Sequence, residues 1–179
     1  MLDTSELNRR PGTMRRVSLT VPPPPGLAVA MVRLDEDSAL ELDLRLESVL
    51  EGVLVSGTVR GHYTGECVRC LESLEGDVAA DVQELFVYPD VEREQSDDED
   101  EEPRLVGTLL DLEQVVRDAL VLALPLQPVC REDCRGLCPD CGMRLADEPD
   151  HRHETIDPQW AALQDALPSA SAGSIAQEK

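Results

Sequence analysis

Residues 40–47 alternate strictly between leucine and a charged side chain. A period of two is the period of a β-strand with one face buried and the other in water, so these residues predict a half-buried strand. Residues 53–63 and 78–86 carry a similar alternation. Gly57 and Gly61, on the second of these segments, predict a bulge or a close approach of two backbones. Together the three segments predict an antiparallel meander with long strands.

A further strand is predicted at residues 14–21, where Val17, Leu19 and Val21 share one face. The four prolines of residues 22–25 must end this strand, because proline has no backbone N–H to donate to a β-ladder. Such a run is also stiff and extended. The strand is therefore predicted to be separated from the meander by a rigid spacer.

One main helix is predicted after Asp111, a candidate N-cap with Gln114 in the capping-box position. Apolar residues follow at helical spacing until Pro125 ends the helix. Residues 121–124 are apolar on all sides and predict a buried helix end. Aromatic residues are only 2% of the chain, so the core must be aliphatic. The predicted fold class is α+β: an antiparallel meander, or a partly closed, barrel-like sheet, packed by one helix and followed by a cysteine-rich zinc-knuckle segment.

The length of 179 residues suits one domain with appendages. Residues 1–128 are predicted to form a β-rich core domain with an N-terminal arm. Within it, residues 92–103 include eight acidic residues and one arginine, and predict a disordered acidic loop. Residues 129–165 are predicted to form a metal-binding segment with a short helix around Trp160. Residues 166–179 are small and polar and predict a disordered tail.

The formal net charge is −21, from 37 acidic and 16 basic residues. Such a field repels the phosphates of nucleic acid and attracts basic partners, so basic proteins are the expected partners. Arg9, Arg10, Arg15 and Arg16 make the N-terminal arm locally positive and are candidates for a contact with RNA. Alternatively, these arginines pair with the protein's own carboxylates.

Four of the six cysteines fall within residues 130–141. The sequence from Cys138 to Gly142 is typical of a zinc knuckle: a two-residue spacer lets both thiolates face one ion, and glycine permits the left-handed turn that follows. Cys67 and Cys70 have the same spacing and are predicted to lie at a hairpin tip between the second and third meander strands. In a reducing compartment, such closely spaced cysteines favour a metal over disulfides.

Three ligand sets compete for a structural zinc ion, and their spacing does not decide between them. The most compact set consists of Cys130, Cys134, Cys138 and Cys141. The second joins the knuckle cysteines Cys138 and Cys141 to His151 and His153. The third joins Cys67 and Cys70 to the same knuckle, as in a zinc ribbon.

The N-terminal residues lack the apolar core of a signal peptide, and no apolar run is long enough to cross a membrane. We therefore expect a soluble cytoplasmic protein, with neither a membrane nor a small-molecule substrate among its partners. No helical His-Glu motif, nucleophile elbow or phosphate loop is present, so no catalytic residue is predicted. Two enzymatic alternatives stay open: a zinc-dependent nuclease or other hydrolase, and a thiol oxidoreductase in which Arg69 lowers the pKa of a neighbouring cysteine.

Several motifs in a fixed order resemble a known family. They are residues 65–71, residues 83–86 before the acidic loop, Asp111 and Leu112, residues 122–126, residues 130–134, residues 136–142, and residues 157–158. In this order they resemble the YceD proteins, named for large ribosomal RNA subunit accumulation, and most closely the high-GC Gram-positive branch.

The resemblance implies a non-enzymatic factor in 23S rRNA accumulation or large-subunit assembly. The expected partners are then basic ribosomal or assembly proteins, with rRNA contact through the N-terminal arginines. Related Gram-positive members carry a Cys-x-Cys near the position of His151 and His153, so histidines can substitute there as ligands. Other members lack most C-terminal cysteines. The resemblance therefore implies that zinc stabilises this branch without being the shared function.

Overall fold

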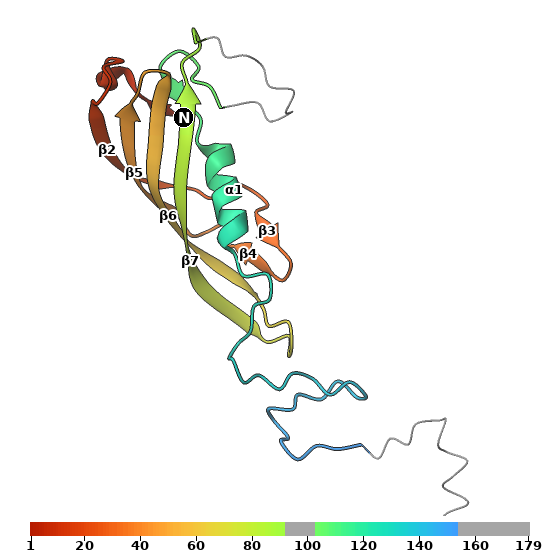
Figure 1. The fold of residues 1–179 in the computed structure, drawn as a ribbon. Helices are drawn as coiled ribbons and strands as arrows, with labels where there is room; N and C mark the ends of the chain where they lie inside the picture. The colour runs from red at the N-terminus through yellow and green to blue at the C-terminus, as the bar shows by residue number, and fades with distance from the viewer. Residues whose placement is uncertain (92–102, 154–179) are drawn as a thin grey trace, which may run out of the picture.

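The computed structural model describes residues 1–91 and 103–153. Its main sheet is built on the predicted meander, in which β5 (Leu40–Ser48), β6 (Gly52–Glu66) and β7 (Ser73–Val87) pair antiparallel in sequence order (Figure 1). The leucines of β5 are buried, while the charged residues between them reach the surface. The alternation of the sequence is therefore the alternation between core and solvent.

The shorter strands extend the sheet along one edge of β6. On this side, β2 (Met14–Val21) pairs with β5 and extends the sheet beyond it. β4 (Val32–Leu34) pairs with residues 63–65 of β6, next to the hairpin turn, and β3 (Ala28–Val29) pairs with β4. The other edge of β6 pairs with β7 along its whole length. No pairing among the described residues joins β7 to β2, so the sheet is open and the barrel-like alternative is wrong.

Glycines let the strands of the meander approach closely. A Cβ on Gly57 would lie 2.1 Å from the Asp43 carbonyl oxygen, and one on Gly61 would lie 2.6 Å from a methyl group of Leu40. The register between β6 and β7 continues without interruption from Gly52 to Glu66. Of the two roles predicted for these glycines, close packing is the one observed, and the bulge is absent from this ladder.

The N-terminal arm is part of the folded body. Here β1 (Leu2–Asp3) pairs with β8 (Leu109–Leu110), and the short 3-10 helix η1 (Ser5–Leu7) buries Leu7 in the core. Arg9 donates two hydrogen bonds to Asp90, at 2.9 and 3.0 Å, and lies over the ring of Tyr88. Arg15 pairs with Glu6 at 3.2 Å. Two of the four arginines thus pair with the protein's own carboxylates.

Helix α1 (Glu113–Ala123) lies against the sheet beside β7 (Figure 1). It begins two residues after Asp111, whose side chain accepts a hydrogen bond from the Glu113 N–H at 3.1 Å. The side chain of Gln114 donates to Asp118, so the predicted capping box is not formed. The helix ends at Ala123, and the next residue, Leu124, is extended because it precedes Pro125.

The core lies between α1 and the sheet. Val116 and Leu120 of α1 are buried against it, as is Leu124 just beyond the helix. Leu122, however, is 87% exposed, so the prediction of a uniformly buried helix end is wrong. A helix that packs on one face of a sheet buries a single stripe, and the sequence between residues 121 and 124 does not indicate which side faces outward.

Three predictions fall outside the described residues: the acidic loop apart from Pro103, the helix around Trp160, and the C-terminal tail. The described parts of the chain include no helix with the length and hydropathy needed to span a bilayer.

Candidate metal centres

All eight predicted ligands gather into two separate groups of four. The first group contains Cys67, Cys70, Cys130 and Cys134, and the second contains Cys138, Cys141, His151 and His153. Within each group the ligand atoms lie within 4.8 Å of one another. The compact set of four C-terminal cysteines is therefore divided between the groups, and the knuckle does not join Cys67 and Cys70. The second predicted set is the one that the structure brings together intact.

The tip of the β6–β7 hairpin positions Cys67 and Cys70, where the sequence predicts them. The Cys67 N–H donates to the Glu72 carbonyl oxygen at 2.8 Å, and the Leu71 N–H donates to the Cys67 carbonyl oxygen at 2.9 Å. These bonds close a tight turn with Leu71 at a φ of 59°. As a result, both thiols face the same side of the hairpin tip.

The chain that follows α1 runs back past this hairpin tip (Figure 1). The Val68 N–H donates to the Pro128 carbonyl oxygen at 2.9 Å, and the Leu137 N–H donates to the Arg69 carbonyl oxygen at 3.0 Å. Between these two bonds, the segment carries Cys130 and Cys134 over the hairpin. A backbone contact at each end therefore fixes the two segments together around the four thiols.

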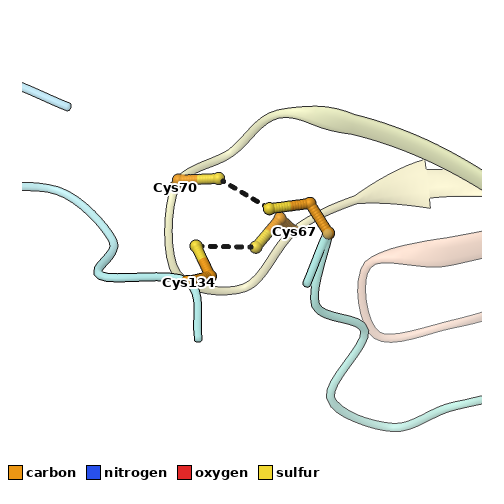
Figure 2. A group of neighbouring side chains, drawn as sticks. Cys67, Cys70 and Cys134 are labelled. Atoms are coloured by element: carbon orange, nitrogen blue, oxygen red, sulfur yellow. Dashed lines mark hydrogen bonds between the residues drawn. The ribbon is translucent and has the colours of Figure 1, made fainter. Parts of the chain in front are cut away.

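The sulfurs of the first group have the spacing of a tetrahedral metal site. The Sγ atoms of Cys67 and Cys134 lie 3.8 Å apart (Figure 2), and those of Cys70 and Cys130 lie 3.6 Å apart. Sulfurs about 2.3 Å from one tetrahedral zinc ion lie about 3.8 Å from each other. A disulfide needs about 2.05 Å, and all six cysteines are free. The arrangement can therefore enclose a single thiophilic ion.

Backbone groups prepare this group for negative charge. Burial opposes ionisation of Cys67, but the N–H groups of Cys130, Arg69 and Cys70 outweigh it and lower the Cys67 pKa to about 6. Desolvation and hydrogen bonds to neighbouring thiols raise the pKa of Cys130 to about 12. Cys67 is therefore the thiol that the backbone prepares most for ionisation, while burial and the neighbouring thiols oppose ionisation of Cys130.

The knuckle of the second group has the predicted turn. The Gly142 N–H donates to the Cys138 carbonyl oxygen at 2.9 Å, and Gly142 has a φ of 73°. The N–H groups of Cys141 and Asp140 point to the Cys138 sulfur and lower its pKa to about 6, against the effect of burial. Cys138 is therefore held as a thiolate at neutral pH.

Both histidines present Nε2 to the Cys141 sulfur. His151 Nε2 lies 3.2 Å and His153 Nε2 lies 3.1 Å from that sulfur, and the two nitrogens lie 2.8 Å apart. Glu148 lies 3.5 Å from Nδ1 of His151, on the far side of the ring. A carboxylate there favours the tautomer that leaves Nε2 free for an ion. An ion about 2.1 Å from each nitrogen would separate them by a further half ångström or so.

The structure does not support the suggested role of Arg69 beside a reactive thiol. Its guanidinium donates to the carbonyl oxygens of Glu132 and Cys134, at 3.1 and 3.0 Å. The low pKa of Cys67 results from backbone N–H groups instead. Arg69 therefore ties the hairpin to the segment after α1.

A family model described as "Large ribosomal RNA subunit accumulation protein YceD" matches residues 55–166. The chain belongs to the YceD family. The resemblance inferred from the order of motifs is thus confirmed. The matched region of this YceD protein runs from β6 through α1 and includes both ligand groups.

Relatives of this YceD protein occur in mycobacteria, as expected for the high-GC branch. It is 49% identical over 166 residues to uncharacterized proteins of Mycobacterium tuberculosis and Mycobacterium bovis, covering 93% of this chain and 80% of theirs. It is 42% identical over 167 residues to an uncharacterized protein of Mycobacterium leprae, covering 93% and 77%. No solved structure matches the chain.

Sequence reasoning named every residue of the two groups as a candidate ligand but missed the pairing of Cys67 and Cys70 with Cys130 and Cys134. One signal was available, because Pro125 ends the helix and, with Pro128, turns the chain away from it. That signal gives no direction by itself. Which cysteines meet Cys67 and Cys70 depends on how far the β6–β7 hairpin extends past the end of α1. Only the structure shows that distance.

Proposed function

We propose that this YceD protein supports the accumulation of 23S rRNA and the assembly of the large ribosomal subunit as a binding factor, with zinc in a structural role. The observation that carries the proposal is the family match over residues 55–166. The match takes in both ligand groups, so the C-terminal segment belongs to the region that defines the family membership of this chain.

The ligand groups favour a structural over a catalytic ion. Each group supplies four protein ligands, whereas a catalytic zinc ion keeps one position open for water or substrate. In the first group, Cys67, Cys70 and Cys134 are also buried. An ion held in this way contributes its binding free energy to folding.

The charge distribution favours a basic protein as the partner. The net charge of −21 attracts lysine- and arginine-rich surfaces and repels rRNA phosphates. Acidic side chains on the exposed face of β5 and β7 include Glu41, Asp43, Asp77 and Asp81. Arg9 and Arg15 already pair with Asp90 and Glu6, which reduces the positive charge that the N-terminus can offer to rRNA.

Complementation tests this function. A mycobacterial strain depleted of the 49% identical relative should lose 23S rRNA relative to 16S rRNA, and expression of this chain should restore the ratio. A ratio that is unchanged by depletion would contradict the role in accumulation.

A cleavage assay separates the binding factor from the nuclease alternative. The purified, zinc-loaded protein should leave precursor 23S rRNA intact during incubation. Cleavage that disappears in the His151→Ala, His153→Ala variant would overturn the non-enzymatic proposal and assign the second group to catalysis.

A further inference from the structure

The two ligand groups share no ligand, and each is complete. We propose that the protein binds two zinc ions at sites with different duties: a four-thiolate site that fastens the segment after α1 to the β6–β7 hairpin, and a two-thiolate, two-imidazole site that closes within the C-terminal segment and exchanges its ion more readily. This inference deepens the structural role of zinc in the proposed function and rests on it.

The donor atoms select the metal. Four sulfurs, or two sulfurs and two imidazole nitrogens, in a tetrahedral arrangement are the ligand sets typical of structural zinc. Calcium and magnesium prefer oxygen ligands, and neither group contains a carboxylate. All ligand atoms of a group lie within 4.8 Å of one another, which is too compact to surround a cluster of several metal ions.

The first site joins two distant parts of the chain. Cys67 and Cys134 are 67 positions apart, and Cys70 and Cys130 are 60 positions apart. An ion held by all four thiolates therefore acts as a cross-link between the hairpin and the segment after α1. The backbone bonds of Val68 and Leu137 align these segments, and the ion compensates for the charge that the four thiolates bring together.

The second site is local. Its four ligands lie between Cys138 and His153, and no ligand comes from the sheet or from α1. The segment still contacts the chain beside the first site, because the Leu145 N–H donates to the carbonyl oxygen of Gly136 at 3.1 Å, and Gly136 lies against Arg69 of the hairpin tip. Loss of the second ion should therefore loosen residues after Cys138 and leave the cross-link in place.

Burial predicts the order in which the ions leave. Three of the four ligands of the first site are buried, namely Cys67, Cys70 and Cys134. In the second site only Cys138 is buried, while Cys141 and His153 are exposed. A chelator in solution can approach the second ion directly, whereas it reaches the first only after the segment lifts from the hairpin.

The test counts ions in the full-length protein, purified and loaded with zinc under reducing conditions. Elemental analysis should find two zinc ions per chain in the wild type. The His151→Ala, His153→Ala variant should retain one, and its cobalt-substituted form should show the intense sulfur-to-metal absorption of a four-thiolate site. Two ions in this variant, or one ion in the wild type, would overturn the proposal. Iron at the first site would overturn its zinc identity.

A chelator experiment on the wild type tests the order of release without any substitution in the first site. Zinc release should be biphasic, with one ion per chain in each phase, and only the fast phase should be absent from the His151→Ala, His153→Ala variant. Release in a single phase would contradict separate sites. These outcomes do not depend on the role in 23S rRNA accumulation. The chain can bind two ions and have no effect on 23S rRNA, and it can affect 23S rRNA while binding fewer than two ions.

Discussion

At the scale of the residue, Gly136 lies where the C-terminal segment packs closely against the hairpin. Its φ of 78° lies in the left-handed region, and a Cβ there would be 2.9 Å from the Arg69 carbonyl oxygen. That oxygen already accepts the Leu137 N–H. The position therefore requires glycine for two separate reasons, conformation and space.

Gly136→Ala should destabilise the protein more than Gly107→Ala does. Gly107 has a φ of 66° and nothing within 4 Å of its added Cβ, so it incurs only the conformational cost of about 1–2 kcal/mol. Gly136→Ala adds crowding against backbone, and we expect about 1 kcal/mol more. Urea unfolding of both variants under identical reducing conditions measures the difference. Equal losses would mean that the hairpin and segment do not pack as described.

Asp43 on the open face of the sheet should make the stability depend on acid pH. Hydrogen bonds from Ser18 and Arg60 hold its pKa below the usual 3.8. The folded state thus favours the carboxylate, so the contribution is complete above pH 3.8 and is lost as pH falls through the folded-state pKa. Asp43→Asn and Arg60→Gln should each lose less stability than the wild type between pH 5 and pH 3. Parallel curves for all three proteins would contradict this prediction.

At the scale of the element, α1 has one buried stripe and one exposed side. Leu120 is 0% exposed and packs in the core, whereas Leu122 in the same turn is 87% exposed. Both leucines have the same helix propensity and differ in their surroundings alone. They form a matched pair for measuring how much the contact between α1 and the sheet stabilises the fold.

Leu120→Ala should lower the free energy of unfolding by about 2–5 kcal/mol, because it leaves a cavity between helix and sheet. Leu122→Ala should change it by no more than about 0.5 kcal/mol. Chemical denaturation of the two variants decides the point. Similar losses would indicate that α1 buries a different face, or that Leu122 is covered in solution.

The elements were predictable where side-chain periodicity determines them. The strand predicted at residues 14–21 is β2 with the same bounds, and the alternation of residues 40–47 is that of β5. The register of the helix was not predictable at its end, because residues 121–124 are all apolar. The second ligand group was among the predicted sets, but the first was not, because the spacing of Cys67 and Cys70 specifies a knuckle without specifying which distant segment meets it.

At the scale of the whole molecule, the described residues form an open sheet with one α-helix and a long hairpin, and the segment after α1 lies against the tip of that hairpin (Figure 1). The chain is strongly acidic, with a net charge of −21. Such a molecule suits a partner of opposite charge. Its binding should therefore be sensitive to salt, because mobile ions screen exposed charges.

Binding to basic large-subunit proteins should weaken as salt rises, whereas binding to 23S rRNA fragments should be weak at every salt concentration. Isothermal titration or filter binding from 50 to 300 mM salt measures both. Tight rRNA binding with a steep negative salt slope would show that positively charged residues of the protein neutralise phosphates. The protein-partner proposal would then be wrong.

The most direct measurement is the location of the protein in cells during ribosome assembly. Chemical cross-linking followed by gradient sedimentation of a lysate from mycobacteria that express this chain in place of the 49% identical relative should place the protein with precursors of the large subunit. Its cross-links should be to lysine- and arginine-rich proteins and should persist after ribonuclease treatment. Sedimentation as a free protein throughout growth, or cross-links to rRNA alone, would contradict the account.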